Sequence, residues 1–217
     1  MNISAGSPRR SEARLARVDR QRPAAAGHST RLLGRSGMPR FVVLLRGVNV
    51  GKANRIPMEQ FRRLLQDLSY TQVRTLLNSG NAVFSSPGRS PGAHGKGIEA
   101  VLRDGPGLAV QVVVKSSREF DAAVAGNSIA PPPKDHSRFL VVFSQERQAL
   151  EKLVELASLV QPPERLVFGA HAAYLYCAGG ILQSKAATAL LGRAGRGVTT
   201  RNWATVLKLS ELLHEGQ

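Results

Sequence analysis

Residues 38–58 read Met38-Pro-Arg-Phe-Val-Val-Leu-Leu-Arg-Gly-Val-Asn-Val-Gly-Lys-Ala-Asn-Arg-Ile-Pro-Met58. The apolar run Phe41–Leu45 is typical of a strand that is buried on both faces. It ends abruptly in a polar loop with two glycines, which let the backbone turn sharply and present amide N–H groups to a bound anion. Pro57 suits the first turn of a helix, where no backbone N–H is needed. The stretch therefore predicts a strand, a ligand-facing loop and a helix start.

Strand and helix patterns continue to alternate up to residue 136. Apolar residues between Met58 and Leu68 recur on one face of a helix. Asn78-Ser79-Gly80-Asn81 is a hairpin signal, because glycine takes positive φ and asparagine tolerates turn geometry. A Gly/Pro/Ser-rich loop is expected at Pro87–Gly97. We expect further strands at Gln72–Leu77, Ala82–Ser85 and Leu108–Lys115, and helices at Ile98–Asp104 and from Ser117 onward, with Ser116 or Ser117 as N-cap.

The rest of the chain repeats this order of elements. We expect strands at Arg138–Ser144, Leu166–Phe168 and Ala172–Cys177, and helices at Gln148–Ser158, Ser184–Leu191 and Arg201–His214. Two successive β-α-β-β-α units predict an α+β protein with two ferredoxin-like halves, residues 38–136 and 137–217, made of antiparallel sheets and packed helices. The two halves share no sequence identity that supports a duplication, so this prediction rests on the order of elements alone.

The net charge of +15 raises the hypothesis of a nucleic-acid partner. Eight Arg and two acidic residues give residues 1–37 a charge of +6, while 22 basic and 13 acidic residues give the remainder +9. The remainder contains no block of five or six basic residues, and scattered basic residues are typical of solvated faces. The predicted strands also lack the aromatic signature of RNA-binding sheets. Nucleic-acid binding therefore stays a second hypothesis.

Residues 1–37 carry no sustained apolar face and are rich in Arg, Ala, Ser and Gly. This composition predicts a disordered basic extension. Three interpretations are open: a mis-called start, with Met38 as the true first residue, a basic arm for an anionic partner, or a targeting segment. The Arg-rich, Lys-free composition favours the mis-called start, because a transit peptide ordinarily avoids acidic residues such as Glu12 and Asp19.

Several function classes lack their sequence signals. No apolar run approaches the roughly 20 residues that span a bilayer, and no secretory signal is present, so we expect a cytoplasmic protein without a membrane partner. The single cysteine, Cys177, cannot form an internal disulfide and is expected to be a small buried residue. The sequence shows no P-loop, dinucleotide or metal-ligand spacing, so we expect no cofactor and no metal. No catalytic residue is indicated, enzyme activity stays open, and nothing sets the oligomeric state.

Three separated motifs carry a resemblance to a known family. They are Leu44–Gly51, Ser79–Phe84 and Thr199–Trp203. In this order they resemble the bacterial domain-of-unknown-function family 1697, whose members look like Leu-Leu-Arg-Gly-x-Asn-Val-Gly-Gly, Ser-Gly-Asn before a strand, and Thr-Thr-Arg-Asn-Trp. Ser184-Lys185 also matches a Ser-Lys pair that the family tends to carry.

The resemblance extends over essentially all of the chain after residue 37. Two positions depart from it: Lys52 replaces the usual second glycine, and Asn78 replaces the usual glutamine. The resemblance implies the fold, but it implies no reaction, since the family has none established. The function must therefore be inferred from the residues.

The candidate site unites polar residues from the three motifs. Arg46 could clamp a phosphate or a carboxylate, and Thr199–Asn202 are expected at a helix start, where the dipole favours an anion. The predicted ligand-binding residues are Arg46, Gly47, Asn49, Gly51, Asn78, Ser79, Asn81, Thr200, Arg201 and Asn202. We expect an anionic small molecule that is phosphorylated, carboxylated or a nucleotide. The alternatives are that these residues only shape and cap turns, with Trp203 as a core anchor, or that they stabilise charge in an enzyme of unknown reaction.

Overall fold

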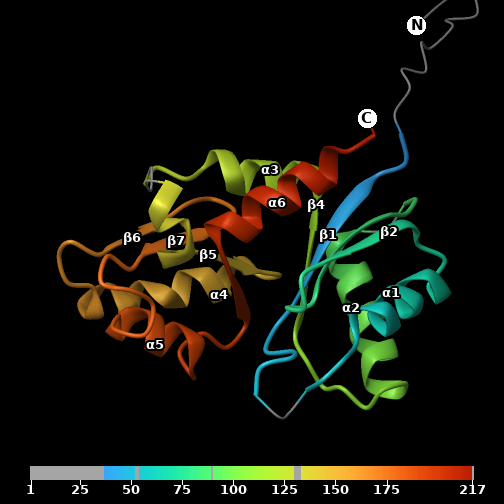
Figure 1. The fold of residues 1–217 in the computed structure, drawn as a ribbon, viewed down its shortest axis with the longest axis horizontal. Helices are drawn as coiled ribbons and strands as arrows, with labels where there is room; N and C mark the ends of the chain where they lie inside the picture. Colours follow the sequence, from blue (N-terminus) through green and yellow to red (C-terminus); the bar gives the residue numbers. More distant parts are fainter. Residues whose placement is uncertain (1–36, 52–53, 89, 130–132, 217) are drawn as a thin grey trace, which may run out of the picture. The chain divides into compact units, whose positions relative to one another are not determined.

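The computed structural model describes residues 37–51, 54–88, 90–129 and 133–216. The expectations for residues 1–36 and for Lys52 lie outside these residues. The first half contains β1 (Arg40–Leu45), α1 (Met58–Asp67), β2 (Thr71–Leu76), β3 (Asn81–Ser85), α2 (Pro91–Asp104), β4 (Val112–Ser116) and α3 (Ser117–Ala125) (Figure 1). The second half contains the 3-10 helix η1 (Pro133–Arg138), β5 (Phe139–Ser144), α4 (Arg147–Glu151), the 3-10 helix η2 (Lys152–Leu159), β6 (Arg165–Phe168), β7 (Ala173–Tyr176), α5 (Lys185–Leu191), β8 (Val198–Asn202) and α6 (Trp203–His214).

Each half forms a four-stranded antiparallel sheet. The strand orders are β2-β3-β1-β4 and β6-β7-β5-β8, so corresponding strands occupy corresponding places. In both sheets the first strand of the half lies between the third and the fourth, which is the ferredoxin-like arrangement. The predicted α+β class with two ferredoxin-like halves is confirmed.

Strand β1 is buried on both faces, as its apolar run predicts. Val43 and Leu45 belong to a core formed with α1 and α2, whereas Val42 and Leu44 point to the opposite face of the sheet. There they join a second core that contains side chains of α3, α6 and the second sheet, and α3 packs directly on α6. A third core lies between the second sheet and the helices α4, η2 and α5. The middle core joins the two halves.

The prediction that Thr199–Asn202 lie at a helix start is wrong. These residues form β8, in which Arg201 pairs with Val141 and Thr199 with Phe143 of β5. The β-branched run that opens the segment fits a strand better than a helix. Helix α6 begins only at Trp203. Asn202 is its N-cap, and the Asn202 Oδ1 accepts from the Thr205 N–H at 2.9 Å.

Other boundaries also differ from the sequence-based ones. Helix α2 begins at Pro91, not at Ile98, because Ser90 caps it and proline occupies its first turn. Its glycines gave the segment the composition of a loop. The single helix expected at Gln148–Ser158 is a short α4 followed by η2, and the fourth strand of the first half begins at Val112 rather than Leu108.

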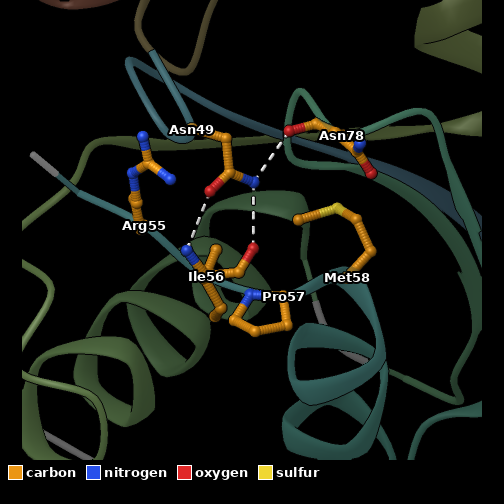
Figure 2. A pocket seen from close by; sticks show the side chains of 6 residues that line it. All are labelled: Asn49, Arg55, Ile56, Pro57, Met58 and Asn78. Carbon is orange, nitrogen blue, oxygen red and sulfur yellow. Dashed lines mark hydrogen bonds between the residues drawn. The ribbon is translucent and has the colours of Figure 1, made fainter. Parts of the chain in front are cut away.

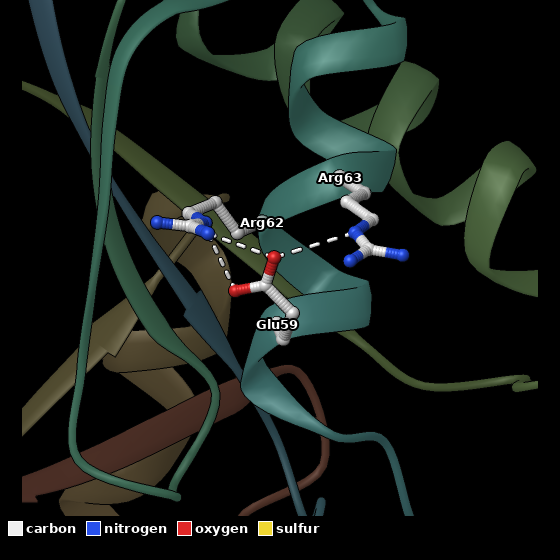
Figure 3. A network of polar contacts seen from close by, with 3 residues as sticks. All are labelled: Glu59, Arg62 and Arg63. Atoms are coloured by element: carbon white, nitrogen blue, oxygen red, sulfur yellow. Dashed lines mark hydrogen bonds and ion pairs between the residues drawn. The ribbon is translucent and has the colours of Figure 1, made fainter.

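Some of the basic residues are neutralised on the surface. On α1, the carboxylate of Glu59 pairs with the guanidinium groups of Arg62 and Arg63 (Figure 3). The hydrogen bond from Arg62 is the main cause that lowers the pKa of Glu59 below its ordinary value. All three side chains are well exposed, so these ion pairs contribute little to folding.

No helix in the described part of the chain is long and apolar enough to cross a membrane.

Candidate functional site

A hollow of about 400 Å³ brings the three sequence motifs together. Its first wall comes from the end of β1 and the following loop, with Ser79 of the β2–β3 hairpin, and its second wall comes from α5, β8 and the first turn of α6. The lining residues are Leu45, Arg46, Gly47, Val48, Val50, Ser79, Leu190, Leu191, Thr199, Thr200, Arg201, Asn202 and Thr205. Segments more than 100 residues apart in the chain therefore share one concave surface.

Arg201 is a buried cation whose hydrogen-bond partners are all neutral. Its Nη2 donates to the carbonyl oxygens of Leu45 and Ser79 at 2.7 and 3.1 Å, and its Nη1 donates to Thr199 Oγ1 and Thr200 O. Its Nε donates to Oδ1 of a further residue, the fully buried Asn81. Burial lowers the pKa of Arg201 to about 10, so the side chain remains charged at neutral pH. No carboxylate in the described chain bonds to it.

Asn81 completes this arrangement from the first residue of β3. Its Nδ2 donates to the carbonyl of Leu76 at 3.0 Å while its Oδ1 accepts from Arg201. Both functions of the amide are therefore used inside the protein. Arg201 and Asn81 join the end of β1, the hairpin and β8 into one rigid wall of the hollow.

Arg46 binds the segment that precedes β8. Its Nη2 donates to the carbonyls of Leu191 and Gly192 at 3.2 and 3.1 Å, and its Nη1 donates to those of Gly195 and Val198. Partial burial lowers the pKa of Arg46 below its ordinary value. Its Nε has no acceptor among the described residues. Arg46 thus clamps the α5–β8 turn of the second half to the end of β1.

Asn49 and Asn78 lie in a neighbouring hollow of about 410 Å³ (Figure 2). Asn49 has a left-handed φ of 57° and exchanges two hydrogen bonds with Ile56, through Oδ1 and Nδ2, both at 2.9 Å. The same Nδ2 also donates to the carbonyl of Asn78 at 2.8 Å. The side chain therefore folds the loop after β1 back onto the hairpin.

We expect Asn49→Gly to lower the free energy of unfolding by about 1–3 kcal/mol, because it keeps the left-handed φ but removes three hydrogen bonds. Urea denaturation measures the change. Asn54→Gly is the matched control, since Asn54 also has a positive φ, of 51°, but its side chain bonds to no described residue. Equal urea midpoints for the two variants would contradict the assigned role of Asn49.

Residues 38–174, more than half of the chain, match the family model described as "Protein of unknown function (DUF1697)". The chain belongs to this family. The resemblance inferred from the motifs is thereby confirmed, although Thr199–Trp203 lies beyond the matched residues.

The solved structure of conserved bacterial protein SP0830 from Streptococcus pneumoniae is similar to this chain, with a TM-score of 0.68 and 24% sequence identity. The match covers 82% of this chain and 99% of that chain. That similarity supports the fold, and no curated protein matches the chain.

The structure of this DUF1697 protein divides the ten predicted site residues into three groups. Those that line the hollow shared by the three motifs are Arg46, Gly47, Ser79, Thr200, Arg201 and Asn202. Asn49 and Asn78 line the neighbouring hollow. Gly51 and Asn81 line neither, the first being exposed and the second fully buried.

Four polar groups in the DUF1697 hollow have no hydrogen-bond partner among the described residues. The hydroxyls of Ser79, Thr200 and Thr205, and the Nδ2 of Asn202, make no hydrogen bond within the described chain, yet all four residues line the hollow. Thr205 as a residue is only 7% exposed, but its unpaired hydroxyl is not among the described side-chain atoms that are both fully buried and without a partner, so the hydroxyl keeps contact with solvent. Sequence reasoning missed it; the available signal is its place three residues after the N-cap Asn202, on the same face of α6.

Two other predictions concern groups away from the hollow. Cys177 is fully buried, as expected, and burial raises the pKa of its thiol to about 11. Trp203 is a core residue that packs edge-on against Phe139 at 5.5 Å between ring centroids.

The described residues contain no group of three or more His, Cys, Asp or Glu side chains that could hold a metal ion.

Proposed function

We propose that this DUF1697 protein binds an anionic small molecule in the hollow between its two halves. The observation that carries the proposal is Arg201, a buried cation that borders the hollow and has only neutral hydrogen-bond partners. Arg46 adds a second guanidinium that donates only to carbonyls. No carboxylate of the described residues lines the hollow, so both charges act on whatever enters it.

The two arginines act through their field more than through direct contact. Every N–H group of Arg201 already has an acceptor, so an anion would gain from the charge while bonding to other donors. At an effective dielectric constant of about 20, a unit charge about 5 Å away contributes roughly 3 kcal/mol. The direct donors are the unpaired hydroxyls of Ser79, Thr200 and Thr205 and the amide of Asn202. A fixed positive field with unpaired donors is the arrangement of an anion site.

A thermal-shift titration tests the proposal with inorganic phosphate, small carboxylates and mononucleotides, each at constant ionic strength. A ligand at a hundred times its Kd stabilises the native state by about 2.7 kcal/mol. For a chain of this size we expect Tm to rise by roughly 5–10 °C. Nucleic acid is included as a competitor, and displacement of the small anion by it would favour a nucleic-acid partner instead.

Thr205→Val is the diagnostic variant. It removes a hydroxyl that makes no hydrogen bond to any residue that the structure describes, so the stability of the unliganded protein should be unchanged or slightly higher. The ligand-induced shift should fall by more than half, because the hydroxyl is lost as a donor. If no anion in the panel raises Tm above the chloride control, the proposed function is wrong.

A further inference from the structure

We propose that the anion is a phosphate monoester of a small apolar body, with the phosphate at the start of α6 and the body against Val50 and Leu191. This inference rests on the proposed function and specifies its ligand class. It follows from three features of the hollow: which donors remain unpaired, where large apolar side chains are exposed, and how large the hollow is.

The unpaired donors favour a phosphate over a carboxylate. Carboxylates are commonly bound by the planar fork of an arginine, but the fork of Arg201 is fully used by internal acceptors. What remains comes from three segments: Ser79 of the hairpin, Thr200 of β8, and Asn202 with Thr205 of the first turn of α6. Donors supplied by three separate segments suit the three terminal oxygens of a phosphate monoester better than the two oxygens of a carboxylate.

The start of α6 adds a second reason. The helix has 12 residues, and its first turn carries partial positive charge that stabilises an anion. Independently of the dipole, Thr205 lines the hollow and is 7% exposed. Its hydroxyl makes no hydrogen bond within the described chain. The hydroxyl is not fully buried, so it keeps contact with solvent, and a phosphate oxygen bound in the hollow would replace water as its hydrogen-bond partner.

Two large apolar side chains define the other part of the hollow. Val50 is 74% exposed and comes from the loop after β1, whereas Leu191 is 50% exposed and ends α5. Both line the same hollow as the phosphate donors, above the buried Val48 and Leu190. An apolar body in contact with both would remove their surfaces from water and contact both halves at once.

The size of the hollow limits the ligand. A volume of about 400 Å³ lies near the lower end of the range for small-molecule sites. It accommodates a phosphate with a body of a few carbons or one ring system. A dinucleotide is too large to be enclosed there.

Isothermal titration calorimetry of the full chain with inorganic phosphate, ethyl, butyl and hexyl phosphate tests the inference. Each methylene that becomes buried should tighten binding by about two- to fourfold. Hexanoate and hexanol are the arms that separate phosphate from carboxylate recognition and from apolar binding alone. We expect hexyl phosphate to bind at least tenfold more tightly than either of them.

Two variants assign the parts of the ligand to parts of the hollow. Val50→Ser with Leu191→Ser should flatten the dependence on chain length while leaving the affinity for inorganic phosphate within twofold. Thr205→Val should weaken the whole phosphate series by about tenfold and keep the dependence on chain length. Leu182→Ser is the matched control, because Leu182 is 89% exposed and lies outside this hollow.

The outcomes separate the inference from the proposed function. A phosphate series with no dependence on chain length would overturn the apolar body and leave anion binding intact. Hexanoate binding as tightly as hexyl phosphate would overturn the phosphate assignment. Failure of every anion to bind would overturn the proposed function and this inference with it.

Discussion

Gly80→Ala should lower the free energy of unfolding by about 3 kcal/mol and Tm by roughly 6–12 °C. Gly80 has a φ of 70°, and a Cβ added there would lie 2.6 Å from both Leu45 Cβ and Val48 Cγ2. The backbone cannot move away freely, because the Gly80 carbonyl accepts from the Leu45 N–H at 2.8 Å. The alanine variant therefore combines backbone strain with overpacking, and chemical denaturation monitored by circular dichroism measures the loss.

Gly107→Ala separates the two contributions. Gly107 has a nearly identical φ of 71°, but no atom lies within 4 Å of an added Cβ. That variant should lose only about 1 kcal/mol, which is the typical cost of a left-handed alanine. If both variants lost the same amount, the close contact with Leu45 and Val48 would not matter. Since these two side chains also line the hollow, Gly80→Ala should weaken anion binding, whereas Gly107→Ala should not.

The sequence predicts best those elements whose local pattern agrees with their burial. Strand β1 is buried on both faces, so its apolar run is continuous and easily recognised. Helix α2 is the opposite case, since three glycines within it conceal a helix whose start is fixed by Ser90 and Pro91. The predicted β-α-β-β-α order was correct in both halves although several element boundaries were wrong, and this order alone was enough to predict the two ferredoxin-like halves.

The β-branched start of β8 is a local strand signal, but the burial of the strand's polar residues depends on distant partners. A segment that contains Thr199, Thr200, Arg201 and Asn202 looks solvated when read locally. Arg201 is nevertheless buried, because the carbonyl of Leu45, 156 residues away, and the amide of Asn81 satisfy it. No pattern within a window of sequence contains that information.

The candidate site shows the same limit. The motifs identified polar residues that mostly lie around one hollow. They did not show which hydrogen-bond donors of these residues remain unpaired. Arg46, Asn49, Asn81 and Arg201 use their side chains mainly on the protein itself, whereas Ser79, Thr200 and Asn202 retain unpaired groups. Thr205 was overlooked because its signal, a place three residues after the N-cap, depends on recognising Asn202 as the N-cap, and the helix was expected to begin at Arg201.

Arg201→Met should destabilise the protein by about 3–5 kcal/mol, the usual cost of removing one partner from a buried polar network that contains a charge. Methionine fills similar space but leaves the Ser79 carbonyl and the Oδ1 of Asn81 without the donor that Arg201 provides, and leaves the Leu45 carbonyl with only the Thr199 hydroxyl at 3.4 Å. Arg201→Lys keeps the charge but offers three donors instead of five, so its loss should be intermediate. Urea denaturation of both variants gives the order.

The partner of Arg201 can be tested by a double-mutant cycle with Asn81→Leu. Once Asn81 is apolar, no buried Oδ1 is left unsatisfied, so Arg201→Met should cost at least 1 kcal/mol less in that background. Arg193→Met is the control for loss of a positive charge, since Arg193 is exposed and its side chain bonds to no described residue; its effect should stay within about 0.5 kcal/mol. Additive effects of Arg201→Met and Asn81→Leu would mean that the two side chains are not coupled. A large coupling would establish that the hydrogen bond between Arg201 and Asn81 stabilises this wall of the hollow.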